Sequence, residues 1–175
     1  MTESTPSEAR AHAEGIALAR AARRGDTLAM QDLLGLLTPY VARICTPIAL
    51  CGGPDATQEA LVVVFRSLRS LREPEALYGW VRAIAVREAV RIARRDARDR
   101  PAELTELPER GDPQLGADIR DVLARLAPEH RAVLVLRDIE GLDEQAAAAL
   151  LDVPTGTVKS RLHRARASFR RAWSA

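Results

Sequence analysis

Aromatic residues make up only 3% of this 175-residue chain, so little in the sequence favours a β-sheet. Strands are enriched in aromatic and β-branched residues, whereas the abundant Ala, Leu, Arg and Glu of this chain favour helices. Apolar residues form 47% of the chain and charged residues 29%, which suffices for a buried core in a soluble protein. The composition therefore predicts an all-α fold.

Cysteine and histidine, the usual ligands of structural metals, are also scarce. Cys45 and Cys51 are separated by five residues, which matches neither a CxxC redox pair nor a zinc framework. Only His12, His130 and His163 could complete a metal site. We expect no metal and no cofactor, and interpret the cysteines as two small buried thiols in a reduced compartment. A metal or redox role is the alternative.

Long apolar runs are absent as well. No such run reaches 18 residues, and the polar residues 1–13 lack the apolar core of a signal peptide. These features predict a cytoplasmic protein without membrane insertion. The sequence also lacks a nucleophile beside its base, a Gly-rich phosphate loop and a metal-ligand spacing, so we expect no enzyme activity.

Positive charge is only slightly in excess, because the formal net charge is +2. Taken alone, this value argues against a strongly basic nucleic-acid binder, but the average hides segregation. Residues 1–100 carry 15 basic and 12 acidic side chains, residues 101–130 carry three and seven, and residues 131–175 carry eight and five. Residues 155–175 hold six basic side chains and no acid. The chain therefore has two basic regions on either side of an acidic segment.

Proline and glycine divide the chain into four segments. Residues 1–13 offer little to bury and are predicted to be disordered. Residues 14–98 are predicted to form a first helical domain, and residues 117–175 a second. Residues 99–116 hold three prolines and two glycines and are interpreted as an acidic linker between the domains.

Helix breakers and caps subdivide the first domain. One helix is predicted to end at Pro39 and another to run from Pro39 to Leu50. Asp55 or Thr57 is predicted to cap the next helix, and Pro74 to begin the one after it.

The last two helices form the most informative stretch. Asp143 is predicted to cap a helix over residues 144–151, and a turn at residues 152–154 leads into a basic helix over residues 155–171. This arrangement predicts a helix-turn-helix, whose second helix enters the major groove of DNA. Its inward stripe is Val158, Leu162, Ala165 and Phe169, and its polar, cationic face is Lys159, Ser160, His163, Arg164 and Ala167. A solvated basic helix that caps a small bundle is the alternative.

Three runs in the second domain resemble region 4 of bacterial sigma factors, most closely the extracytoplasmic-function (ECF) group. They are residues 126–137 (LAPEHRAVLVLR), 140–142 (EGL) and 153–166 (VPTGTVKSRLHRAR). The resemblance implies that this domain reads the −35 promoter element in the major groove. The candidate contacts to bases and phosphates are Thr155, Thr157, Lys159, Ser160, Arg161, His163, Arg164 and Arg166. Asp152 stands where the family usually has Gly, and Asp tolerates a left-handed backbone.

The first domain resembles sigma region 2, which binds the polymerase clamp and opens the −10 element. Residues 80–95 (WVRAIAVREAVRIARR) keep the family's Trp, Ile-Ala and Arg-Arg spacing. Arg87 stands in place of a common Asn, and Arg91 in place of a common Asp. The candidate contacts to the −10 element are Tyr78, Trp80, Arg82, Arg87, Arg91, Arg94 and Arg95. The alternatives are a core position for Trp80 and a solvated helix end for the arginines.

Residues 55–62 (DATQEALV) are similar to the acidic, polymerase-facing helix of the family. The usual Gln-Glu pair falls on Leu61 and Val62, and Leu68 replaces a common Trp. The candidate polymerase contacts are Asp55, Gln58, Glu59, Leu61, Val62 and Arg66. A surface acidic patch or a set of helix caps is the alternative for the polar members.

The leading hypothesis is a two-domain all-α sigma factor that binds core RNA polymerase, recognises the −35 and −10 elements and promotes transcription initiation. Its partners would be double-stranded promoter DNA, the melted −10 strand and, as is frequent in the family, an anti-sigma protein. The apolar Leu61 and Val62 motivate the rival hypothesis, a sigma-like helix-turn-helix regulator or decoy without initiation activity.

Overall fold

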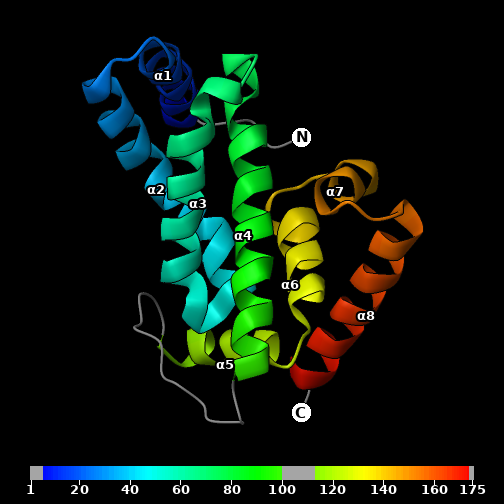
Figure 1. Cartoon of the computed structure of the whole chain (residues 1–175). Coiled ribbons are helices and arrows are strands. Elements are labelled where there is room, and N and C mark those ends of the chain that lie inside the picture. Colours follow the sequence, from blue (N-terminus) through cyan, green and yellow to red (C-terminus); the bar gives the residue numbers. More distant parts are fainter. Residues whose placement is uncertain (1–5, 100–112, 174–175) are drawn as a thin grey trace.

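The computed structural model describes residues 6–99 and 113–173, and every element within these ranges is helical (Figure 1). The N-terminal half, residues 6–99, contains α1 (Pro6–Arg23), α2 (Thr27–Ala49), α3 (Gly53–Ser67) and α4 (Leu77–Asp99), with 3₁₀ turns at Leu50–Gly52, Leu68–Ser70 and Pro74–Ala76. The C-terminal half, residues 113–173, contains α5 (Pro113–Ala124), α6 (Pro128–Leu134) with a π-helical extension at Val135–Ile139, α7 (Glu144–Leu151) and α8 (Thr155–Trp173). The predicted all-α fold class is confirmed.

Helix α2 is the central element of the N-terminal half and packs against α1, α3 and α4. Its buried stripe recurs every three or four residues and is Leu33, Leu37, Val41, Ile44 and Ile48. The stripe continues across Pro39, so the predicted helix boundary there is wrong. A proline inside a helix costs about 3 kcal/mol, and burial of the side chains on both sides of Pro39 outweighs that cost.

The start of α3 also differs from the prediction, because the helix begins at Gly53 and neither Asp55 nor Thr57 caps it. Thr57 is buried, and its hydroxyl donates a 2.8 Å hydrogen bond to the carbonyl oxygen of Gly53. A Cβ atom at Gly53 would lie 2.9 Å from the Cα of Thr46. The glycine therefore lets α3 begin in close contact with α2.

The N-terminal helix extends further than the sequence predicts, because α1 begins at Pro6 within a segment expected to be disordered. Two contacts with Tyr78 of α4 explain this order. Its hydroxyl donates to the carbonyl oxygen of Ala11 at 3.1 Å, and its ring stacks on His12 with the centroids 4.4 Å apart. Residues 113–116 of the predicted linker are likewise helical, and residues 1–5 and 100–112 lie outside the described ranges.

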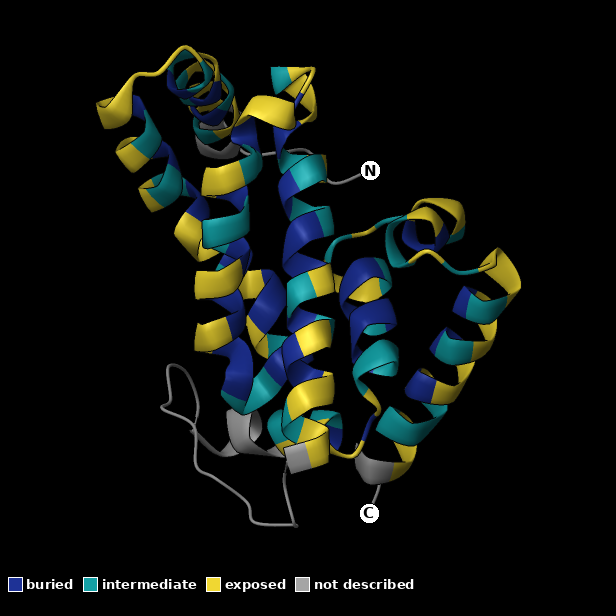
Figure 2. Cartoon of the chain, in the orientation of Figure 1, coloured by how far each residue is buried: buried dark blue, intermediate teal, exposed yellow. Residues whose placement is uncertain are grey.

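The helix-turn-helix forms as predicted. The Asp143 carboxylate accepts a 2.7 Å hydrogen bond from the backbone N–H of Ala146 at the start of α7. Asp152 adopts the left-handed conformation, with a φ of 52°, in the turn that follows. The side of α8 that faces α6 is buried at Val158, Leu162 and Ala165, whereas Phe169 is half-buried (Figure 2).

The two halves pack directly against each other, since α6 contacts both α2 and α4, and α7 contacts α4 (Figure 1). One cluster of buried apolar residues extends through both halves. The stretch Thr27–Ser70 is long and apolar enough to span a membrane by hydropathy alone. Several of its large apolar side chains, such as Leu33 and Leu37, are fully buried in this shared core.

Candidate nucleic-acid interface

The outer face of α8 is polar, cationic and exposed. Lys159, Ser160, His163 and Arg164 are all exposed on it. Lys159 Nζ lies 3.4 Å from Oε2 of Glu144 on α7. His163 and Arg164 form no ion pair with any described residue. Because the opposite face of α8 is anchored in the core, these side chains stand on a rigid support, as a recognition helix requires.

The other −35 candidates flank this face. Thr155 is exposed at the first turn of α8, and Thr157 is half-buried, with its carbonyl oxygen accepting a 3.0 Å hydrogen bond from Ser160. Arg166 forms an ion pair with Asp138. Arg161 is half-buried and lines a cleft between the halves. The eight candidates therefore do not lie on one common surface. The four that share the outer face of α8 are Lys159, Ser160, His163 and Arg164.

Two arginines of α8, Arg161 and Arg164, act on the pKa of His130 in α6. Burial lowers the pKa of His130 below its usual value, and the positive charges of Arg161 and Arg164 lower it further. A positive potential that disfavours imidazole protonation favours an anion such as a phosphate.

The arginines of α4 lie at the surface but are mostly paired with carboxylates. Arg91 lies 2.7 Å from Glu88, and Arg95 lies 3.2 Å from Asp96. Arg87 donates to the carbonyl oxygen of Ala83 in its own helix. Four of the predicted −10 residues, Arg87, Arg91, Arg94 and Arg95, line a cleft of about 710 Å³ between α4 and the helix-turn-helix, together with Arg161. The structure thus brings part of the −10 set close to the −35 set.

The two aromatic −10 candidates have structural roles in this arrangement. The Tyr78 ring stacks on His12 and makes an edge contact with Tyr40, whose centroid lies 5.3 Å away. Trp80 is half-buried against the apolar core. Both side chains therefore help to hold the bundle.

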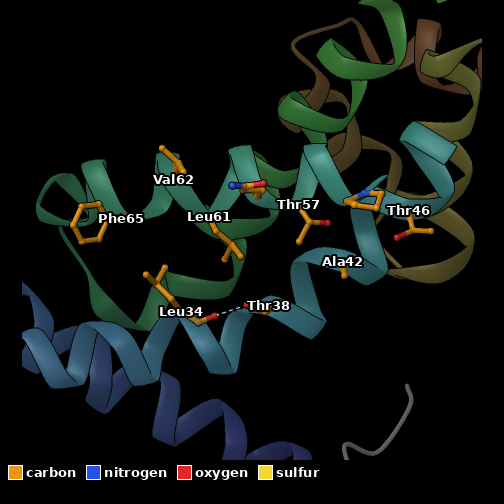
Figure 3. A pocket seen from close by; sticks show the side chains of 10 residues that line it. Leu34, Thr38, Ala42, Thr46, Thr57, Leu61, Val62 and Phe65 are labelled. Carbon is orange, nitrogen blue, oxygen red and sulfur yellow. Dashed lines mark hydrogen bonds between the residues drawn. The ribbon is translucent and has the colours of Figure 1, made fainter. Parts of the chain in front are cut away.

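The predicted polymerase contacts divide between two sides of α3. Asp55 and Glu59 face α4, since each lies 3.8 Å from an arginine of that helix, Arg95 and Arg91 respectively. Gln58, Leu61 and Val62 instead line a groove between α2 and α3 (Figure 3). Arg66 is exposed near the end of α3.

This groove has a volume of about 620 Å³ and is predominantly apolar. Its other lining residues include Leu34, Ala42 and Phe65 (Figure 3). Phe65 is 56% exposed. An exposed aromatic ring beside an apolar groove is typical of an interaction surface.

The sequence reasoning missed the buried charge at Arg131. Its Nε donates to the carbonyl oxygen of Ile48 at 2.6 Å, and its Nη1 donates to the carbonyl oxygens of Leu123 and Leu126. Burial lowers the pKa of Arg131 to about 10, so the guanidinium stays charged at neutral pH. A charged residue directly before the apolar run 132–136 was the available signal.

Glu140 was also missed. Its side chain is only 2% exposed and is paired with Arg43 and Arg82 of the N-terminal half. The sequence offers no sign of this contact, because the partners lie 97 and 58 positions away along the chain.

The cysteines and the acidic side chains are the remaining groups capable of redox or metal chemistry. Cys45 is buried and Cys51 is half-buried. Burial raises the pKa of Cys45 to about 12, which keeps it protonated and unreactive. Within the described ranges, no group of three or more His, Cys, Asp or Glu side chains is placed to hold a metal ion.

Comparison with known proteins identifies the family. Residues 117–169, which span the helix-turn-helix, match the family Sigma-70, region 4. The ECF RNA polymerase sigma-E factor of Haemophilus influenzae is 33% identical over 153 residues, which cover 75% of this chain and 76% of that protein. The chain belongs to the ECF RNA polymerase sigma factors.

Other relatives of this ECF sigma factor carry related names. The ECF RNA polymerase sigma-E factor of Escherichia coli is 29% identical over 164 residues, covering 82% of this chain and 86% of that protein. The ECF RNA polymerase sigma factor SigE of Mycolicibacterium smegmatis is 38% identical over 128 residues, or 66% of this chain. The sigma factor described here spans 49% of that relative's length.

Two solved structures share the fold of this sigma factor. CnrH, in complex with the cytosolic domain of CnrY, superposes with a TM-score of 0.64 at 22% identity and covers 92% of this chain and 97% of that one. The sigma factor RpoE of Bartonella quintana, in complex with the anti-sigma factor NepR, gives a TM-score of 0.67 at 21% identity, covering 83% and 96%. At these identities the likeness concerns the fold.

Proposed function

We propose that this sigma factor reads the −35 promoter element with α8, follows the −10 element with α4 and binds core RNA polymerase through α3. The exposed, cationic face of α8, within the residues that match Sigma-70 region 4, carries this proposal. Lys159, Ser160, His163 and Arg164 contact base edges and nearby phosphates in the major groove. The flanking Thr155, Thr157, Arg161 and Arg166 contact the DNA backbone.

The −10 element is assigned to α4 because five predicted contacts are arginines of this helix, whose charges can follow phosphates. They are Arg82, Arg87, Arg91, Arg94 and Arg95. Tyr78 and Trp80 are the aromatic candidates for stacking on unpaired bases. For this role, the two halves act as separate domains, 14–98 and 117–175, joined by residues 99–116.

The polymerase contact is assigned to Asp55, Gln58, Glu59, Leu61, Val62 and Arg66 on α3. The apolar groove supports this assignment, because half-buried Leu61 and Val62 and exposed Phe65 offer apolar area to a partner. The protein acts in the cytoplasm without catalysing a reaction. Because CnrH and RpoE are each in a complex with another protein, an anti-sigma factor is a further proposed partner.

Reconstituted transcription tests this function directly. The purified chain is combined with core polymerase on a library of promoter fragments, and start sites are mapped with and without the chain. We expect initiation at a defined subset of fragments that depends on the added chain. A correctly folded protein that supports initiation on no fragment would contradict the proposal.

A regulator or decoy without initiation activity is the second candidate function, favoured by the apolar Leu61 and Val62. Retention of the chain on immobilised core polymerase separates the two, because a DNA-only regulator is not retained. For a sigma factor, Leu61→Asp should abolish retention, since it places a charge in the apolar groove. Leu28→Asp is the matched control, because Leu28 is 72% exposed at the start of α2, outside the groove lining.

A further inference from the structure

Two cations of α8 are paired with carboxylates of the elements that support this helix. Lys159 Nζ lies 3.4 Å from Oε2 of Glu144 on α7, and Arg166 pairs with Asp138 of the π-helical extension of α6. The two pairs differ in place, because Lys159 belongs to the outer face of α8 whereas Arg166 flanks that face. The Glu144–Lys159 pair therefore adds a carboxylate to a surface that is otherwise polar and cationic.

Glu144 is positioned by the local structure of the helix-turn-helix. It is the first residue of α7, directly after the Asp143 cap, whose carboxylate accepts from the backbone N–H of Ala146. A negative charge at the N-terminus of a helix is stabilised by the helix dipole. Because α7 packs against α8 across the turn at Asp152, the fold sets the distance between Glu144 and Lys159. The pair is thus preorganised before DNA binds.

The Glu144–Lys159 pair offers donors and an acceptor side by side to solvent. The side chain of Lys159 is 63% exposed and that of Glu144 is 35% exposed. A lysine ammonium has three N–H donors and no acceptor, whereas a carboxylate only accepts. Since one N–H faces Glu144, two remain for a ligand, and the carboxylate keeps free lone pairs. The pair therefore fits a surface on which acceptors lie directly beside a donor.

The major-groove edge of a G·C base pair is such a surface. Guanine presents N7 and O6 as acceptors, and the paired cytosine presents its N4 amino group as a donor. Cytosine N4 and guanine O6 are hydrogen-bonded to each other and lie about 2.9 Å apart, close to the 3.4 Å between Lys159 Nζ and Glu144 Oε2. In an A·T pair the donor, adenine N6, lies between two acceptors. The ammonium would then meet a donor where a G·C pair presents O6.

A DNA phosphate fits the Glu144–Lys159 pair less well than this base edge. The negative charge of a phosphate is repelled by the Glu144 carboxylate, and a phosphate offers no donor to that carboxylate. The amino group of cytosine supplies the missing donor. The carboxylate therefore directs Lys159 to a base edge rather than to the DNA backbone.

We propose that Glu144 is a specificity-determining residue of this sigma factor and reads one G·C pair of the −35 element together with Lys159. Lys159 donates to N7 and O6 of the guanine, and Glu144 accepts from N4 of the paired cytosine. Glu144 is not among the −35 contacts predicted from the sequence. The inference rests on the proposed function, because it requires α8 to enter the major groove at that element.

Selection from a randomised −35 element tests this inference. A promoter fragment that supports initiation in the reconstituted assay is randomised at its −35 element and bound by the full chain with core polymerase, and the retained duplexes are sequenced. The wild-type chain should prefer G·C over the other pairs at one position by about tenfold. E144Q keeps the size of the side chain but replaces the acceptor-only carboxylate with an amide, so this preference should be lost while the other positions keep theirs. K159Q should relax the same position.

D138N is the matched control. It removes one negative charge from the other pair and releases Arg166 beside the outer face of α8. It should therefore tighten binding to all sequences alike and leave every base preference unchanged. Circular dichroism checks the fold of each variant, and K159Q provides the test should E144Q be unfolded.

Four results would overturn the inference. They are an unchanged preference in folded E144Q, relaxation of different positions by E144Q and K159Q, a wild-type preference for A·T at the shared position, or loss of the same preference in D138N. Each of them leaves the proposed function standing, because the wild-type chain still selects a −35 sequence. A wild-type chain that selects no sequence, or that supports initiation on no fragment, would instead contradict the proposed function and the inference together.

Discussion

The two arginine-rich helices, α4 and α8, differ in how many of their basic side chains are paired with carboxylates. On α8, His163 and Arg164 are exposed and form no ion pair with a described residue, whereas on α4 most of the arginines face carboxylates. The paired arginines of α4 are Arg82, Arg91, Arg94 and Arg95. Similar composition thus gives two different surfaces. Positive charge that the fold leaves unpaired is more readily available to phosphates than charge already paired with a carboxylate.

The largest expected effect concerns the core that supports both helices. Leu37→Ala in the N-terminal half and Leu136→Ala in the C-terminal half each remove a fully buried side chain and should cost about 2–5 kcal/mol. Because one apolar cluster spans both halves, urea unfolding followed by circular dichroism should show a single transition in both variants. The exposed Leu28→Ala is the control and should change little. Two transitions, each sensitive to only one substitution, would show that the halves are independent.

The second effect concerns the free charge of α8. Arg164→Ala should weaken binding of polymerase-bound protein to a cognate −35 duplex by about 1–3 kcal/mol if Arg164 contacts a base. Arg171→Ala, on a later turn of the same helix, should act weakly and without sequence preference. Competition binding with cognate and random duplexes measures both. Equal losses for the two variants on both duplexes would reject the assigned face.

A smaller effect distinguishes free from paired arginines within α4. Arg87 makes only a hydrogen bond to its own helix, whereas Arg95 is paired with Asp96 and lies near Asp55. Arg87→Ala should therefore reduce the salt dependence of non-specific DNA binding by the free protein by about one unit of slope. Arg95→Ala should reduce it less. A larger reduction of the slope in Arg95→Ala than in Arg87→Ala would show that ion pairing does not determine which arginines of α4 are available to DNA.

The smallest effect is a pH dependence at His130. Its pKa is lowered in the folded protein, so the unfolded chain binds more protons as the pH falls through the usual value of 6.5. Stability contributed by the neutral imidazole is present above pH 6.5 and is lost as the pH falls below it. The unfolded chain binds less than one proton more than the folded protein over this range. Urea unfolding from pH 7.5 to 5.5 measures the slope, which should flatten in His130→Gln. An unchanged slope in His130→Gln would show that His130 does not contribute to the pH dependence of stability.

The C-terminal half was largely predictable because its determinants are local. The Asp143 cap, the left-handed Asp152 and the buried stripe of α8 each follow from residues a few positions apart. The outward face of α8 follows from the same periodicity. Local spacing therefore predicted both the helix-turn-helix and its exposed cations.

The N-terminal half and the contact between the halves were less predictable because distant packing decides them. Pro39 stays inside α2 only because residues on both sides are buried against other helices. Tyr78 orders residues 6–13 through contacts with Ala11 and His12, more than 60 positions away. The pairing of Glu140 with Arg43 and Arg82 leaves no periodic signal in the sequence.

The central claim is that this sigma factor becomes a specific promoter reader only when polymerase holds its two halves apart. The most direct measurement is the affinity for a cognate promoter duplex and for a random duplex, with and without core polymerase. Our account predicts weak, nearly unspecific binding by the free protein and strong discrimination by the polymerase complex, because two linked sites then act together. Equally tight and specific binding by the free protein would contradict it.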